Sequence, residues 1–267
     1  MLAEALTWLI TPAPWAARRL GYLKEAVAIT ARYRRCRAAW APHLEQSRDA
    51  ILAFSAQQPR RRTLVVLGSG AGLDLPLEAL APQWQRIVLV DLVHPWAIRR
   101  RAARLPQVAF ATWDIAGVAA TLLARPDHLP EPVPQWPLPA DTDAVVSLNV
   151  MAQLPVVPLA WLAAHGVPDA ACDVWAQQVV AAHWRQLARL GIPALLITDF
   201  AAEARPCHNR TLQRTPTQAT PAEMVQSTLF GFALPHAPVR TWVWTIAPCG
   251  EVSPAWERRL HVGVFAP

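Results

Sequence analysis

Short apolar runs rich in β-branched residues alternate with stretches of helical apolar spacing from Thr63 to the end of the chain. Each run ends in a polar or glycine-rich corner, which is typical of parallel strands joined by helices. We predict strands at Thr63–Leu67, Arg86–Val90, Gln107–Thr112, Asp143–Ser147, Ala194–Thr198, Val239–Ala247 and Arg259–Phe265. We predict helices over Leu73–Leu80, Pro95–Leu105 and Cys172–Leu190.

The chain before Thr63 has a different pattern. Apolar side chains there recur at spacings of three and four residues, which predicts one stripe on a helix. The stripe consists of Tyr22, Ala26, Ile29, Tyr33, Cys36 and Trp40. Pro42 is expected to end this helix, and a second helical stretch is expected over His43–Phe54. We therefore divide the chain into an N-terminal helical segment, residues 1–58, and a sheet domain, residues 59–267.

Composition narrows the class of protein. With 53% hydrophobic and 16% charged residues, the chain can bury a full core, which excludes a disordered tail and a disulfide scaffold. No run approaches the roughly 18 to 20 apolar residues of a membrane span, and no positive charge precedes the apolar N-terminus as in an export signal. The four cysteines form no C-x-x-C pair, so we expect no zinc knuckle or redox dithiol and a cytoplasmic location.

A glycine-rich corner follows the first predicted strand. Residues 68–72 read Gly-Ser-Gly-Ala-Gly. Glycine allows a tight turn there and lets a ligand approach the backbone, while amides at the start of the next helix face that ligand. Asp91 ends the second strand, where an acidic side chain can accept both hydroxyls of a ribose. The two corners predict an adenosyl or nucleotide site.

The nicotinamide fingerprint requires a small residue where this chain has Leu73, so an NAD-dependent oxidoreductase is disfavoured. The G-x-G-x-G corner instead resembles the first motif of Rossmann-like (class I) S-adenosylmethionine-dependent methyltransferases, and the resemblance covers residues 63–265. It implies a doubly wound, mostly parallel Rossmann-like α/β sheet with a terminal antiparallel hairpin. It also implies that S-adenosylmethionine is held by Gly68, Ser69, Gly70, Gly72, Asp91, Leu92, Asp114, Ile115 and Asn149.

Four positions bear on this resemblance, those of Asp114, Asn149, Val66 and Asp74. Asp114 matches the acid that binds adenine, and Asn149 lies in the segment that borders the methyl group and the acceptor. Where the family usually has an acid two residues before the first glycine, this chain has Val66. Asp74 either compensates for the missing acid or caps the following helix.

We expect the N-terminal helices and two long corners, residues 148–171 and 199–222, to form the acceptor pocket, with the helical stripe covering the carboxyl edge of the sheet. Asn149 and His208 are the candidate catalytic residues, with His208 as a base, and Trp161 either lines the acceptor site or packs in the core. His94 and Trp96 either line the adenosyl pocket or have ordinary structural roles. No metal is expected, because Asn149 is a poor ligand for hard cations.

Two classes of acceptor stay open. An apolar corner after the fourth strand favours a small molecule with an apolar body. The net charge of +6 lies in the N-terminal segment, which favours RNA through a basic face. That face consists of Arg32, Arg34, Arg35 and Arg37. A non-catalytic adenosyl-binding protein is the third hypothesis, and the sequence predicts no oligomeric state.

Overall fold

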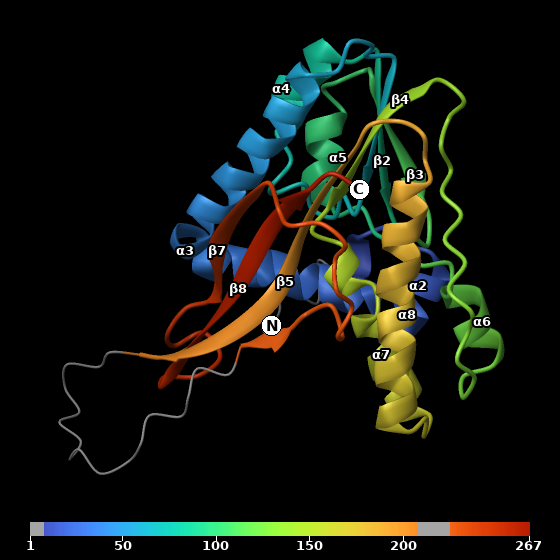
Figure 1. Cartoon of the computed structure of the whole chain (residues 1–267), viewed down its shortest axis with the longest axis vertical. Helices are drawn as coiled ribbons and strands as arrows, with labels where there is room; N and C mark the ends of the chain where they lie inside the picture. The colour runs from blue at the N-terminus through green and yellow to red at the C-terminus, as the bar shows by residue number, and fades with distance from the viewer. Residues whose placement is uncertain (1–7, 208–224) are drawn as a thin grey trace.

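A computed structural model of the chain describes residues 8–207 and 225–267. Its central sheet has the order β3-β2-β1-β4-β5-β8-β7, and β6 pairs with β5 beside this path. Strands β1 to β5 run parallel, whereas β8 is antiparallel to both β5 and β7 (Figure 1). The predicted Rossmann-like sheet with a terminal antiparallel hairpin is thereby confirmed. The strands are β1 Thr63–Leu67, β2 Arg86–Asp91, β3 Val108–Thr112, β4 Thr142–Leu148, β5 Ala194–Pro206, β6 Gln226–Ser227, β7 Arg240–Ala247 and β8 Trp256–Phe265.

Helices cover both faces of the sheet. Because side chains alternate along a strand, β1 sends Leu64 and Val66 into one core and Val65 and Leu67 into the other. Helices α3, α4 and α5 pack over the first core, and α6, α7 and α8 pack over the second (Figure 1). The helices are α2 Trp15–Leu20, α3 Tyr22–Ala56, α4 Leu77–Leu80, α5 Trp96–Ala102, α6 Ala119–Ala124, α7 Val156–Ala164 and α8 Asp169–Ala188, with 3₁₀ turns η1 Ala81–Gln83 and η2 Met151–Gln153.

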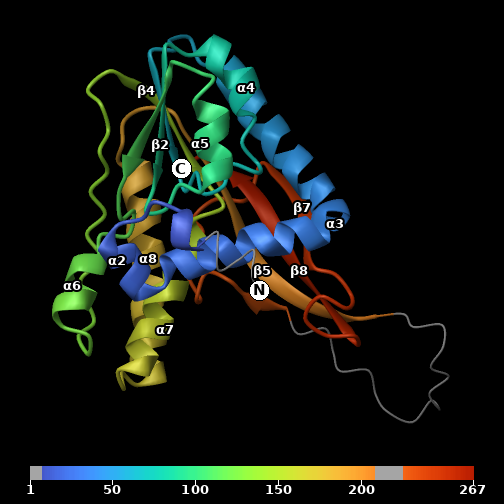
Figure 2. The ribbon, with the colours of Figure 1, turned by 180° about the vertical axis from the view of Figure 1, so that it is seen from behind.

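The N-terminal segment forms the short helix α2 and the long helix α3, and the kink in α3 does not lie at the break that we predicted. Pro42 lies inside α3, and the helix instead changes direction at Cys36, whose φ of −102° and ψ of 17° are not helical (Figure 2). Proline lacks the N–H that would bond to the carbonyl of Ala38, but the helix continues through Pro42, where its neighbours Trp40 and Leu44 are packed in the core. The first part of α3 runs beneath the ends of the parallel strands (Figures 1 and 2).

Two other expected boundaries are wrong. Helix α4 begins only at Leu77, so the glycine corner does not lead directly into a helix. Strand β5 continues to Pro206, because it pairs with β8 along its whole extension. Part of the expected acceptor loop, residues 199–222, is therefore strand.

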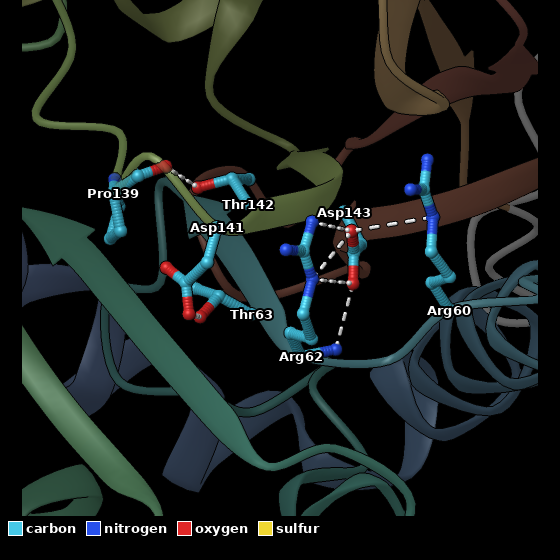
Figure 3. Close-up of polar contacts among 7 residues, drawn as sticks. All are labelled: Arg60, Arg62, Thr63, Pro139, Asp141, Thr142 and Asp143. Carbon is cyan, nitrogen blue, oxygen red and sulfur yellow. Dashed lines mark hydrogen bonds and ion pairs between the residues drawn. The ribbon is translucent and has the colours of Figure 1, made fainter.

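An ion pair between Arg62 and Asp143 joins β1 to β4 at their amino ends, opposite the ends that carry the glycine corner. The Arg62 guanidinium donates from Nη2 to Oδ1 of Asp143 at 2.6 Å, and the Arg62 backbone N–H donates to Oδ2 at 2.9 Å (Figure 3). These hydrogen bonds lower the pKa of Asp143 to about 2. Beside them, the Thr63 hydroxyl donates to Asp141 at 3.0 Å. The amino ends of β1 and β4 are thus fixed to each other, away from the edge that carries the glycine corner.

The cysteines also differ from expectation. Cys207 and Cys249 form a disulfide between the end of β5 and the turn from β7 to β8, whereas Cys36 and Cys172 are free and buried. The two cysteines are 42 residues apart in sequence, and the pairing of β5, β8 and β7 brings them together. Disulfides are typical of oxidising compartments, so the cysteines give no support to a cytoplasmic location. Among the described residues, no helix is long and apolar enough to cross a membrane.

A buried histidine in the second core yields a prediction for stability. His183 on α8 is 1% exposed, and its Nε2 lies 2.8 Å from the Ser147 hydroxyl. Burial lowers the pKa of His183 to about 3, whereas an unfolded histidine titrates near pH 6.5. Below pH 6.5 the unfolded chain binds a proton at His183 that the folded chain does not bind. The unfolding free energy therefore decreases as the pH falls from 6.5 toward the folded pKa of about 3.

When the pH falls from 7.5 to 5, we expect the unfolding free energy of the wild type to fall by about 2 kcal/mol more than that of His183→Gln. Urea denaturation of both proteins at each pH measures this difference, and contributions from other titrating groups cancel in the comparison. Equal losses in the two proteins would contradict a neutral buried imidazole.

Candidate functional site

A cavity of about 520 Å³ lies at the carboxyl edge of the parallel strands. The ends of β1, β2, β3 and β4 form one wall, α3 forms a second, and the extensions of β5 and β8 form a third. Of the residues predicted to bind a cofactor, Gly68, Gly70, Asp91, Leu92, Asp114, Ile115 and Asn149 line this cavity. Ser69 and Gly72 instead line a smaller hollow of about 110 Å³, which shares Gly68, Gly70 and Asn149 with the main cavity. His208 lies outside the described residues.

The Asp91 carboxylate connects the first two corners of the sheet. Its Oδ2 accepts the Gly70 N–H at 2.8 Å, and its Oδ1 accepts the Val93 N–H at 3.2 Å. Burial raises the pKa of Asp91, while these backbone N–H groups act in the opposite direction by stabilising the anion. Each carboxylate oxygen has more than one lone-pair site, so the group can accept further hydrogen bonds from a ligand in the cavity.

The three glycines of the corner have different roles. All have positive φ, of 77° at Gly68, 43° at Gly70 and 63° at Gly72. A Cβ on Gly68 would lie 2.4 Å from Cβ of Val150, and one on Gly72 would lie 2.4 Å from Cδ1 of Ile98. A Cβ on Gly70 would meet nothing closer than Oδ2 of Asp91, at 3.9 Å. Packing therefore requires glycine at the outer two positions, and open cavity faces the middle one.

Asp114 caps a helix as well as lining the cavity. Its Oδ1 accepts the Ala116 N–H at 3.1 Å, and its Oδ2 accepts the N–H groups of Val118 at 2.7 Å and Ala119 at 2.6 Å. These bonds satisfy amides at the start of α6. The carboxylate thus has a structural function whether or not it also meets an adenine, which stays a prediction.

Asp74 bonds to Asn149 and does not cap α4. The Asn149 Nδ2 donates to Oδ2 of Asp74 at 2.6 Å, and Pro76 occupies the N-cap position of α4 without a side-chain cap. Asn149 has a left-handed backbone, with φ of 48°, which asparagine tolerates better than most residues. Of the two roles considered for Asp74, capping is wrong. Its carboxyl group instead holds the side chain that follows β4.

A histidine from α3 extends this pair. The Trp242 indole N–H donates to Nδ1 of His43 at 3.0 Å, and Nε2 of His43 lies 3.4 Å from the Asn149 amide. Indole only donates, so a neutral His43 carries its hydrogen on Nε2, and burial lowers its pKa to about 3. Burial also raises the pKa of Asp74.

The N-terminal helix covers the cavity at the carboxyl edge of the sheet, as its apolar stripe predicted. Tyr22, Glu25, Ala26 and Ile29 line the cavity from α3. Burial and the nearby charges of Asp114 and Asp91 raise the pKa of Tyr22 well above its usual value. Their helical spacing was visible in the sequence, but that spacing does not distinguish a core from a cavity wall.

Other predicted side chains lie elsewhere. Trp161 is 9% exposed and belongs to the second core, with the Arg19 guanidinium over its ring, so packing is its role. His94 is buried, with Nδ1 3.5 Å from the Ser69 hydroxyl, and Trp96 is 47% exposed and donates to the Ile10 carbonyl. Neither of the last two lines the cavity. Among the residues described, no group of three or more His, Cys, Asp or Glu side chains could hold a metal ion.

The chain is distantly similar to several solved structures of methyltransferases. No model of a protein family matches the chain, and no curated protein matches it. Among solved structures, the chain is similar to 1,6-didemethyltoxoflavin-N1-methyltransferase from Burkholderia thailandensis, with 14% identity, a TM-score of 0.40, and 95% of this chain and 92% of that chain covered. It is also similar to the N-methyltransferase NodS from Bradyrhizobium japonicum WM9, with 14% identity, a TM-score of 0.36, and coverage of 98% and 97%.

A third likeness is to CalS10, an amino pentose methyltransferase from Micromonospora echinaspora, with 17% identity and a TM-score of 0.30. That match covers 58% of this chain and 49% of CalS10, so it spans about half of the known protein. All three are methyltransferases, the kind of enzyme that the glycine corner resembles. At these identities and TM-scores the likenesses assign no activity to this chain, and its function is argued from its own residues.

The glycine geometry predicts an order of stabilities. We expect Gly68→Ala and Gly72→Ala to lower the unfolding free energy by at least 1 kcal/mol more than Gly70→Ala does. All three suffer the strain of a positive φ, about 1–2 kcal/mol, but only the outer two also force a side chain into packed neighbours. Chemical denaturation measures the three values. Equal losses at all three positions would contradict the open space at Gly70.

Proposed function

We propose that this chain is an S-adenosylmethionine-dependent methyltransferase that acts on a small molecule. One observation carries the proposal. The Asp91 carboxylate, anchored by the Gly70 N–H, lines a cavity at the carboxyl edge of a doubly wound sheet, where such folds bind their ligands. A buried anion with lone pairs left over fits the paired hydroxyls of a ribose.

The remaining lining residues fit the other parts of such a cofactor. Trp113 and Ile115 beside Asp114 offer an apolar surface for a purine, and Asn149 with Asp74 offers polar groups near the glycine corner. Asp74 lines the small hollow beside the glycine corner, and its carboxyl group is our candidate to replace the acid that is missing at Val66. The cavity of about 520 Å³ falls in the range of small-molecule sites.

When bound, the cofactor supplies a methyl group on a sulfonium centre, which is already an activated leaving group. The protein then has to position the acceptor and keep water away. Helix α3 serves the second purpose, because its Tyr22 and Ile29 close the cavity on the side opposite the strand ends. Most of the wall beyond Asn149 is apolar, which supports a small acceptor with an apolar body.

The RNA alternative has less support than its sequence pattern suggested. The Arg35 guanidinium donates to Glu251 at 2.6 Å, and Nε of Arg32 lies 3.6 Å from the same carboxylate. Two of the four arginines of the basic face therefore fix α3 to the turn between β7 and β8. Arg34 and Arg37 are exposed, which is the normal state of basic side chains on a solvated helix face.

Cofactor binding tests the proposal. We expect S-adenosylhomocysteine to bind the purified protein in calorimetric titration and NAD not to bind. Asp91→Asn should weaken S-adenosylhomocysteine binding by about 10- to 100-fold, because hydrogen bonds to a charged acceptor contribute about 1.5–3 kcal/mol. The asparagine keeps the shape of the side chain and an oxygen for the Gly70 N–H. Asp173→Asn, on the exposed face of α8, is the control and should bind as the wild type does. Unchanged affinity in folded Asp91→Asn would overturn the assignment.

Salt dependence tests the RNA alternative. If RNA were bound through this helix face, the logarithm of its affinity would fall with the logarithm of salt concentration, by about 0.7 per phosphate contact for a single strand. We expect no such binding to a 20-nucleotide oligouridylate, and an Arg34→Gln, Arg37→Gln double variant that keeps its S-adenosylhomocysteine affinity. Tight, salt-sensitive RNA binding that the double variant loses would make RNA the acceptor. Arg32 and Arg35 are left in place because their replacement would also disturb the contact with Glu251.

A further inference from the structure

The part of the cavity beyond Asn149 differs from the predicted adenosyl site in the side chains that line it. Ile29 from α3, Ala202 from β5, Ile246 from β7 and Leu260 from β8 give it apolar walls. One buried carboxylate, that of Asp199 on β5, lines the same half. Asp199 begins the second of the two long corners in which the acceptor was expected, residues 199–222, and the described residues form no metal cluster there.

The backbone holds Asp199 beside the residue that follows β4. The Asn149 N–H donates to the Ile197 carbonyl at 2.8 Å, so the end of β4 lies two residues from Asp199 along β5. Asp199 is opposite Val262 on β8, and the pairing shifts between Asp199 and Ala201. Such an irregularity bends a strand and redirects its side chains. Asp199 thus lines the cavity close in the sheet to Asn149, which we predicted to border the methyl group.

The charges around the cavity are mainly negative. In the part of the chain that the structure describes, the carboxylates of Glu25, Asp91, Asp114 and Asp199 line it, together with the guanidinium of Arg258. Asp91 and Asp114 belong to the adenosyl half. Asp199 is 5% exposed, so its charge is poorly screened by water and attracts a cation strongly. Burial raises the pKa of Asp199, and the charge of Arg258 acts in the opposite direction.

We propose that Asp199 binds the acceptor, and that the acceptor is a small apolar molecule carrying a primary or secondary amine. The inference rests on the proposed methyltransferase function and specifies its substrate class. An ammonium group gains an ion pair with Asp199 while the rest of the molecule packs against Ile246, Leu260 and Ile29. A carboxylate acceptor would be repelled by the charge of Asp199, and a neutral alcohol would gain no ion pair with it.

The same carboxylate accounts for the proton of the reaction. An ammonium nitrogen has no lone pair and cannot attack, so R–NH₃⁺ first transfers a proton to the Asp199 carboxylate and becomes R–NH₂. The nitrogen lone pair then forms a bond to the methyl carbon, the carbon–sulfur bond breaks, and sulfur keeps that electron pair as a neutral thioether. The product R–NH₂⁺–CH₃ leaves as the ammonium ion, and the one proton that Asp199 accepted returns to solvent. A carboxylate whose pKa is raised by burial is suited to accept such a proton.

Matched pairs of probes test the proposal by binding alone. Phenethylamine is compared with 2-phenylethanol, and tryptamine with tryptophol, in calorimetric titrations of the wild type with and without saturating S-adenosylhomocysteine. We expect at least one amine to bind at least tenfold more tightly than its alcohol. Asp199→Asn should reduce that preference by at least fivefold while S-adenosylhomocysteine affinity stays within twofold of wild type. The substitution is isosteric and removes a buried charge, so we expect it to fold.

Two further variants make the result specific. Glu25→Gln changes an exposed carboxylate of the same cavity, and Asp173→Asn changes one that does not line it. Both should keep the preference for amines within twofold. Equal binding of amines and alcohols, absence of amine binding, or a preference that survives in Asp199→Asn would overturn the proposal. Failure of S-adenosylhomocysteine to bind would instead overturn the methyltransferase function, since the titrations without it report on Asp199 independently.

Discussion

The hydrogen bond from the Gly70 N–H to the Asp91 carboxylate is the constraint on which the rest of the site depends. It connects the corners after β1 and β2, two adjacent parallel strands, and fixes a charged group at the edge of the cavity. Gly70 can make it because a positive φ brings its N–H toward Asp91 without a side chain in between. The neighbouring corners then add their polar groups around one anchored anion.

Buried carboxylates make this edge of the sheet less stable than it could be. Burial raises the pKa values of Asp74, Asp91 and Asp199, which means that the folded chain holds their charges at a cost in free energy. The opposite edge is different, because Arg62 lowers the pKa of Asp143 with hydrogen bonds. One edge is thus arranged for stability, and the other keeps charges that a ligand can use.

Sequence patterns predicted what local physics determines. The strand limits of β1 and β2 and the position of Asp91 follow from β-branched runs and the polar residues that end them. Features that depend on tertiary contacts were missed. Strand β5 continues past Asp199 because β8 pairs with it, and that same pairing unites Cys207 with Cys249. The stripe of Tyr22, Ala26 and Ile29 predicted that α3 covers the carboxyl edge, but periodicity alone does not show which of its side chains line a cavity and which pack in a core.

A crystal structure of the protein with S-adenosylhomocysteine tests the central claim most directly. The account predicts ligand density in the cavity between α3 and the strand ends. Both ribose hydroxyls should lie within hydrogen-bonding distance of the Asp91 carboxylate, and the Gly70–Asp91 hydrogen bond should be retained. The homocysteine sulfur should face the half of the cavity that Asp199 lines. A ligand bound elsewhere, or one whose ribose makes no contact with Asp91, would contradict the account.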